Sequence, residues 1–182
     1  MSTPRPLVPM LLGVGALLGV GLLAVAPSAT PSSAPSAPPP KLVPPLAGRL
    51  VVTSPFGWRW HPVTGQWSHH DGLDLAAPVG VEVVAPEGGV VTRIDVAGGE
   101  RGAINGNAVF VRAPSRVWAF LHLSRVKVAL GRTVRAGDVL GASGASGRVT
   151  GPHLHLQVTS LGGTPIDPTG LFPPGTFVTR SA

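Results

Sequence analysis

Short apolar runs separated by Gly, Pro, Asn or Asp follow one another through the C-terminal three quarters of the chain. The clearest of these runs are residues 50–53, 81–85, 90–94, 108–111, 117–121 and 154–159. Their β-branched residues and their length predict strands, and no window keeps the period of a helix. We therefore expect an all-β domain, built as a small antiparallel β-sandwich or open β-sheet.

The first 26 residues have a different character. Leu7 to Ala26 is an uncharged apolar stretch of 20 residues, long enough as a helix to cross the ~30 Å hydrocarbon core of a bilayer. Ala24-Val25-Ala26 fits signal-peptide cleavage, whereas the length of the stretch favours a membrane anchor. Both alternatives stay open, and both place the following residues outside the cytoplasm, in the periplasm, in the cell wall or in the medium.

Residues 27–45 separate this segment from the strand-rich region. Eight of these 19 residues are Pro, so the segment forms neither a helix nor a packed core and is expected to be a semi-extended linker. The chain thus divides into a signal peptide or anchor at 1–26, a linker at 27–45 and a folded domain at 46–182. A membrane contact is expected only through the first segment.

Composition narrows the partners of the domain. The chain has no Cys, so its fold is held by its core or a metal, and a lipid-modified N-terminal Cys is excluded. The net charge of +6 favours anionic cell-wall polymers. No nucleic acid is expected, because the basic residues are scattered and no recognition motif accompanies them. Neither Lys41, in the linker, nor Lys127, in an apolar run, fits a biotin or lipoate carrier, and we expect a monomer.

Two separated stretches carry candidate metal ligands. His153 and His155 lie two residues apart, so in a strand they project from one face about 7 Å apart. His70 and Asp74 are separated by a Gly that disfavours a helix, and a bent segment brings both side chains onto one ion. Three N and O ligands with a water in a fourth position describe a hydrolytic zinc site. Two structural histidines on a strand are the alternative.

The same residues resemble the signature of the lysostaphin-type (LytM) zinc metallopeptidases. The match rests on three motifs that follow one another in the family's order along the chain, together with the short sequence segments that flank them between Arg49 and Pro168. The motifs are His70-x-x-x-Asp74, Phe120-Leu-His122-Leu-Ser124 and Gly151-Pro-His153-Leu-His155.

The resemblance implies a β-sheet groove with one Zn²⁺ per chain. His70, Asp74 and His155 are then the metal ligands, while His122 and His153 activate the water and stabilise the tetrahedral intermediate. The implied reaction is hydrolysis of peptide bonds in peptidoglycan, so peptidoglycan peptides are the expected substrate partner.

The chain departs from the family pattern at two positions. Phe120 stands where the family usually carries Tyr, and Gln157 stands where an acidic residue is common. We expect activity with altered specificity.

Two other functions compete with an endopeptidase. The first is a catalytically silent envelope scaffold or activator of another hydrolase, which is disfavoured because all five signature positions are filled. The second is a metal-independent domain that binds polysaccharide through Trp58, Trp60 and Trp67. Trp58 and Trp60 share a face if their segment is extended, and ordinary packing is the plainer explanation for them.

Overall fold

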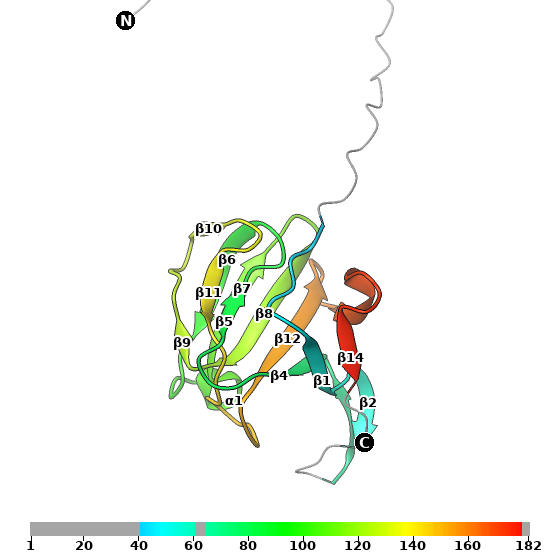
Figure 1. Cartoon of the computed structure of the whole chain (residues 1–182). Helices are drawn as coiled ribbons and strands as arrows, with labels where there is room; N and C mark the ends of the chain where they lie inside the picture. The colour runs from blue at the N-terminus through cyan, green and yellow to red at the C-terminus, as the bar shows by residue number, and fades with distance from the viewer. Residues whose placement is uncertain (1–40, 61–64, 180–182) are drawn as a thin grey trace, which may run out of the picture. The chain divides into compact units, whose positions relative to one another are not determined.

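The two longest strands lie side by side near the middle of a large sheet. β8 (Arg116–Leu123) pairs antiparallel with β12 (His153–Ser160) in the computed structural model, which describes residues 41–60 and 65–179 (Figure 1). Burial along β12 alternates residue by residue, because Leu154, Leu156 and Val158 face the core and the residues between them face the other side. This alternation places the two candidate histidines of β12 on one face.

The large sheet has nine strands in the order β10-β6-β7-β8-β12-β4-β1-β14, with β13 paired to β12. Its remaining members are β1 (Leu50–Ser54), β4 (Gly72–Ala76), β6 (Gly89–Asp95), β7 (Asn107–Arg112), β10 (Thr133–Val134), β13 (Pro165–Ile166) and β14 (Phe177–Thr179). All pairs in the sheet are antiparallel except β1 with β14, which is parallel.

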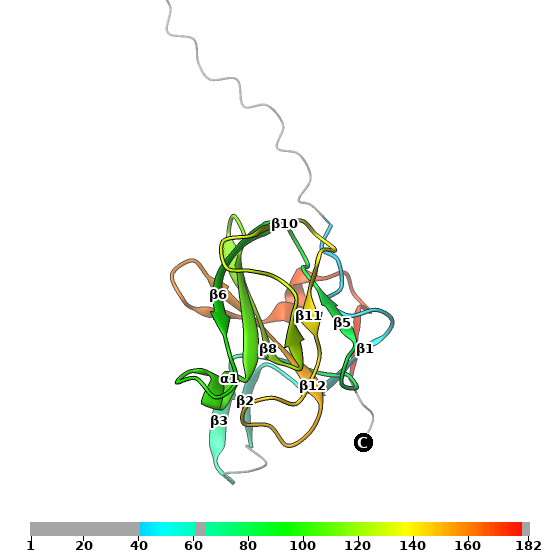
Figure 2. The same ribbon diagram turned by 90° about the vertical axis from the view of Figure 1, so that its left-hand side faces the viewer.

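A second, three-stranded sheet covers one face of the large sheet. It contains β5 (Glu82–Val84), β11 (Val139–Ala142) and β9 (Arg125–Val126), and Figure 2 shows β5 and β11 to the right of β8. Val83 and Leu140 of this sheet pack with Trp118 and Phe120 of β8 in one apolar core. The opposite face of the large sheet, where Ala119 and Leu121 lie, is left as the floor of a groove.

A separate hairpin, β2 (Gly57–Trp60) with β3 (Trp67–His70), extends from the body beside β4 (Figures 1 and 2). Its register pairs Trp58 with His69 and Trp60 with Trp67, so these four side chains share one face. Only two short helical turns are present in the described ranges, α1 (Gly102–Asn105) and the 3₁₀ turn η1 (Pro168–Leu171).

The expected all-β fold, an open sheet with a groove, is confirmed. The six predicted runs correspond to β1, β5, β6, β7, β8 and β12. The sequence pattern does not predict the β2–β3 hairpin or β4, because His, Asp and Gly interrupt their apolar runs. Trp58 and Trp60 do share an extended face, as expected for a strand.

The start of the domain can be followed from Lys41. Leu42 packs against the core, Leu46 is buried, and the carbonyl of Pro45 accepts a hydrogen bond from the N–H of Val84. Residues 41–45, which the sequence assigns to the linker, therefore contact the domain. The expected signal or anchor at 1–26 lies outside the described residues, and none of the helices in the described part of the chain is long and apolar enough to span a membrane.

Candidate metal centre

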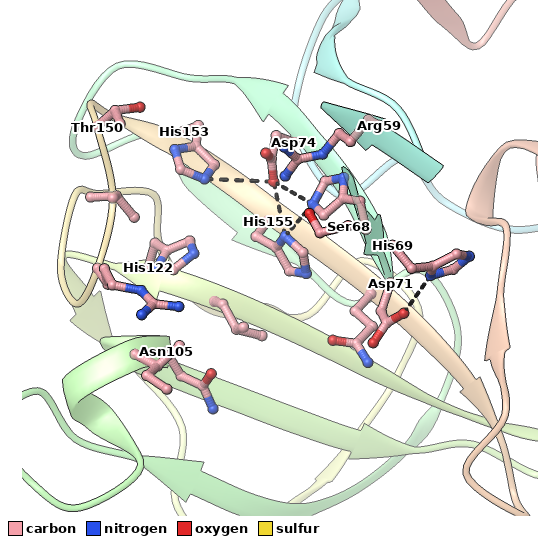
Figure 3. A pocket seen from close by; sticks show the side chains of 16 residues that line it. Arg59, Ser68, His69, Asp71, Asp74, Asn105, His122, Thr150, His153 and His155 are labelled. Atoms are coloured by element: carbon pink, nitrogen blue, oxygen red, sulfur yellow. Dashed lines mark hydrogen bonds and ion pairs between the residues drawn. The ribbon is translucent and has the colours of Figure 1, made fainter. Parts of the chain in front are cut away.

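Asp74 and His155 are brought together by the register of two neighbouring strands. Asp74 of β4 is the direct cross-strand partner of His155 of β12, so both side chains rise from the same face of the sheet. Nδ1 of His155 lies 2.8 Å from Oδ1 of Asp74 (Figure 3). The pair forms the floor of the site.

His70 completes a cluster of three side chains of metal-ligating type. It is the last residue of β3, and Asp71 separates it from the start of β4, which produces the bend expected between His70 and Asp74. Its Nε2 lies 3.2 Å from both Oδ1 of Asp74 and Nδ1 of His155. The three ligand atoms lie within 4.8 Å of one another, as one shared ion requires. Two imidazoles and a carboxylate suit a divalent transition metal, with zinc first among them.

Gly72 provides the space in which the His155 ring sits. A Cβ at position 72 would lie 2.6 Å from the carbonyl oxygen of Leu156 and 2.7 Å from Nε2 of His155. Carbon atoms do not approach these atoms so closely without displacement, so a side chain here would push the imidazole away from Asp74. The glycine is therefore part of the site, although it contributes no ligand atom.

His122 enters the groove through an unusual backbone conformation. Leu121 faces the groove, so regular alternation would turn the next residue, His122, into the core. Instead His122 has φ 64°, the only positive φ outside glycine in the part of the chain that the structure describes. Leu121 and His122 consequently both line the groove, and Leu123 returns to the core.

Backbone carbonyls fix the ring orientations of three histidines. A carbonyl oxygen only accepts hydrogen bonds, so the Nδ1 facing it must carry a proton. Nδ1 of His70 lies 2.8 Å from the carbonyl oxygen of Pro55. Nδ1 of His122 lies 3.0 Å from that of Ser146, and Nδ1 of His153 lies 2.9 Å from that of Gly151. Each of these rings therefore keeps its Nε2 free of a proton when neutral. His155 differs, since its Nδ1 points to Asp74.

Ser146 connects His122 to the loop that holds it. Its carbonyl accepts from His122, while its hydroxyl donates to the carbonyl of Leu123 at 2.6 Å and accepts from the N–H of Asn107 at 2.9 Å. Gly106 packs so tightly on this loop that a Cβ there would lie 2.3 Å from the Ser146 carbonyl oxygen. The loop after β11 is thereby fixed against β7 and β8.

The charge states of two groups are perturbed by these surroundings. Burial by itself would raise the pKa of Asp74, but the hydrogen bond with His155 and the adjacent imidazole of His70 lower that pKa far below its usual value. Burial lowers the pKa of His122 to about 4, despite the hydrogen bond to Ser146. The carboxylate is therefore ionised and His122 is neutral at pH 7.

The cluster lies at the bottom of an open groove with a volume of about 650 Å³. His122 and His153 stand next to the three-residue cluster, with their ring centroids 4.9 Å apart (Figure 3). Arg59 and Ser68 of the hairpin line the groove, as do Ile104 and Arg148. An open trough with a polar centre can admit an extended peptide.

The structure brings together the five side chains that the sequence offers as metal ligands or as groups that act on the water: His70, Asp74, His122, His153 and His155. The roles of Gly72 and Ser146 are not visible in the sequence, because a close approach and a loop contact require the fold to be known. Phe120, which departs from the family pattern, lies away from the groove. That ring is wholly buried in the core behind the sheet, so its missing hydroxyl cannot contact a ligand in the groove directly.

Known proteins resemble this chain over the same region. The model for peptidase family M23 matches residues 68–168. The DD-carboxypeptidase/endopeptidase Mpg of Neisseria meningitidis is 40% identical over 131 residues, which are 71% of this chain and 29% of that protein.

Two solved structures extend the comparison to the fold. A zinc-containing peptidase from Vibrio cholerae superposes with a TM-score of 0.57 at 34% identity, over 64% of this chain and 35% of that one. The catalytic domain of lysostaphin from Staphylococcus simulans gives a TM-score of 0.57 at 27% identity, over 64% of this chain and 87% of that one.

The chain spans less than a third of the length of the Neisseria protein, so the likeness concerns a domain rather than a whole protein. Within that domain, the matched residues cover more than half of the chain and include all five side chains at the centre of the groove. The resemblance seen in the sequence motifs is confirmed, and the chain belongs to peptidase family M23.

Proposed function

We propose that this chain is a zinc-dependent endopeptidase that hydrolyses peptide bonds of bacterial peptidoglycan outside the cytoplasm. The observation that carries the proposal is the convergence of His70, Asp74 and His155 within 4.8 Å at the bottom of an open groove. His122 and His153 add two imidazoles without joining that cluster. Only the folded arrangement brings these five side chains together.

The relatives support the same activity. The Neisseria protein is named as a carboxypeptidase and endopeptidase, the Vibrio structure is described as a zinc-containing peptidase, and a further Vibrio cholerae relative is named a peptidoglycan DD-endopeptidase. For this chain the zinc ion, the peptide substrate and the endopeptidase reaction follow by inference from the shared site. The DD cross-link between peptides is therefore the first bond to test.

In the proposed mechanism His70, Asp74 and His155 hold one Zn²⁺ per chain. A bound zinc ion supplies a Lewis acid that polarises a carbonyl group and lowers the pKa of water. The protonated Nδ1 of His70 is tied to the Pro55 carbonyl, which leaves its Nε2 as the electron-pair donor. The ionised Asp74 offsets the charge of the ion.

His122 and His153 are proposed to move the proton and to stabilise the oxyanion. Both keep Nδ1–H on a backbone carbonyl and both line the groove, so each unprotonated Nε2 can accept a proton and then donate a hydrogen bond. Nε2 of His153 lies 3.6 Å from the Asp74 carboxylate, which places it beside the metal-binding cluster. No Glu lies among the residues that line the groove to take this part.

The walls of the groove suit an extended, anionic peptide. Arg59 of the hairpin and Arg148 of the loop before β12 both line the groove. Nε of Arg59 is buried and has no hydrogen-bond partner among the residues that the structure describes. Both guanidinium groups are suited to bind peptide carboxylates.

A catalytically silent scaffold is the alternative, and the geometry argues against it. A scaffold has no need for three ionisable side chains that meet at one point, and burying such a cluster without an ion carries a cost in free energy.

Export through residues 1–26, either as a cleaved signal or as an anchor, remains a prediction, as do the linker and the monomeric state. Binding to anionic wall polymers is proposed only from the net charge.

Purified full-length chain tests the proposal. It should contain one zinc per molecule and release single peptides from cross-linked peptidoglycan fragments, with products identified by mass spectrometry. Exhaustive chelation should stop the reaction, and added zinc should restore it. Full activity of the chelated protein would refute the metal mechanism, and an unchanged cross-linked substrate in the presence of zinc would refute the substrate class.

A further inference from the structure

The outer face of the β2–β3 hairpin carries a strip of tryptophans that no part of the proposed reaction uses. Trp58, Trp60 and Trp67 are 60% to 73% exposed, whereas the fourth tryptophan, Trp118, is fully buried. The cross-strand register places all three on one side of the hairpin together with His69. The strip is therefore a continuous aromatic surface, which soluble proteins seldom leave open without a binding role.

The two faces of this hairpin divide its residues by chemistry. Gly57, Arg59, Ser68 and His70 alternate with the aromatic residues, and Arg59, Ser68 and His70 line the groove. One thin wall thus presents the proposed metal ligand and a cation inwards and three indoles outwards. An extended peptide of a few residues can therefore span the distance from the outer face of the hairpin to the metal site.

The strip and the groove are physically continuous through His69. The His69 ring packs edge-on against Trp58, with centroids 5.7 Å apart, and the same residue lines the groove next to Asp71. Trp60 and Trp67 extend the strip along the hairpin as an edge-on pair, with centroids 6.4 Å apart. A linear ligand can therefore lie along the strip while a branch of it enters the groove.

We propose that Trp58, Trp60 and Trp67 bind the glycan strand of peptidoglycan, while a peptide attached to that strand enters the groove behind the hairpin. This inference rests on the proposed function. Sugar rings have apolar C–H faces and polar rims, which match an indole that offers a flat apolar face and one N–H donor. The glycan is also the one linear polymer to which the proposed peptide substrate is covalently joined.

The charge of the strip disfavours a membrane surface as its ligand. Surfaces that bind anionic lipids combine aromatic residues with Lys or Arg on the same face. Within the described part of the hairpin, the only such cation is Arg59, and the register turns it to the groove face. The outer face is therefore aromatic and nearly uncharged, which suits a neutral sugar chain.

The test measures binding of the full-length chain to peptide-free glycan strands, which are not a substrate. The double variant Trp60→Leu/Trp67→Leu keeps apolar side chains but removes the flat rings, and we expect its affinity to fall at least tenfold. Trp60→Phe/Trp67→Phe should keep most of the affinity. Leu130→Ala changes a similarly exposed apolar residue elsewhere and should bind as the wild type does.

A second readout separates this inference from the proposed reaction. Hydrolysis of a sugar-free cross-linked peptide should stay within twofold of wild type in the leucine variant, while hydrolysis of intact peptidoglycan should show a raised KM. Zinc content and the midpoint of thermal unfolding report whether each variant is folded. Failure of the wild type to cleave the sugar-free peptide counts against the proposed function, whatever the glycan assay gives.

The inference would be overturned by a wild-type chain that does not bind peptide-free glycan, or by a leucine variant that binds it as well as the wild type. It would also be overturned by tryptophan-dependent binding to phosphatidylglycerol vesicles in place of glycan. Tryptophan-dependent dimerisation without glycan binding would likewise assign the strip to a second copy of the chain.

Discussion

The two sides of the metal centre are held in place by different means. His70, Asp74 and His155 contact one another through their side chains, with Oδ1 of Asp74 2.8 Å and 3.2 Å from the two imidazoles. His122 and His153 lie outside this cluster, and each owes its orientation to a backbone carbonyl, as His70 also does. Loss of one member should therefore disturb the whole first group, whereas loss of one member of the second group should leave the first intact.

Asp74→Ala should have the largest effect. It removes the oxygen that both His70 and His155 contact, and leaves two imidazoles without their shared partner. We expect zinc to be lost on dialysis and hydrolysis to fall to background, as measured by metal analysis and product release. A variant that keeps one tightly bound zinc would show that Asp74 is not a ligand.

His122→Ala and His153→Ala should remove turnover but not metal. Groups that transfer a proton or stabilise developing charge contribute about 10²- to 10⁴-fold to the rate. The fall should appear in kcat, because neither residue belongs to the three-residue cluster. If either variant loses zinc together with activity, the division between the two groups of residues is wrong.

Gly72→Ala tests how tightly the ligand group is packed. The added methyl group would lie 2.7 Å from Nε2 of His155, so the ring must move and zinc affinity should fall about 10- to 100-fold. Overpacking should also lower the free energy of unfolding by about 1–3 kcal/mol. Gly151→Ala is the matched control, since a Cβ there meets nothing within 4 Å. Equal zinc affinity in the two variants would refute this role of Gly72.

Ser146→Ala should act on the second group alone. The change removes two hydrogen bonds of the hydroxyl, to Leu123 and Asn107, but keeps the carbonyl that His122 contacts. We expect a loss of about 1–3 kcal/mol in the free energy of unfolding and a fall of a few fold in kcat, with zinc retained. Ser115→Ala, at an exposed serine, is the control for the stability measurement.

The smallest effect concerns the backbone of His122. At φ 64° any residue with a Cβ is strained, and Gly is not. Of two variants that both lack the imidazole, His122→Gly should therefore be more stable than His122→Ala by about 1 kcal/mol in thermal or urea unfolding. Equal stabilities would show that the left-handed conformation costs little in this strand.

The sequence predicts the site better than it predicts the hairpin beside it. Strand geometry alone places His153 and His155 on one face of the strand. The family motifs then indicate which other side chains lie near that face. Nothing in the sequence shows that Asp74 pairs with His155, because register between strands about 80 residues apart depends on the whole sheet. The left-handed His122 could not be foreseen either, since its local sequence is that of a regular apolar strand.

The amino-acid pattern of the β2–β3 hairpin does not predict two strands. Trp67-Ser-His-His70 lacks an apolar alternation, so it does not resemble a strand until Trp58 and Trp60 are seen opposite it. Gly72 was visible as a residue that disfavours a helix, but its close contact with His155 depends on the tertiary structure.

Three imidazoles in this site take their orientation from acceptors that every amino acid provides. A substitution at Pro55, Ser146 or Gly151 alters a side chain but leaves the peptide oxygen in the chain. Asp74 has no such substitute, because its oxygen belongs to the side chain itself. Mutational tolerance around the centre should therefore be uneven, because Pro55, Ser146 and Gly151 keep their acceptor oxygens whatever side chain they carry, whereas the oxygen of Asp74 is lost with its carboxylate.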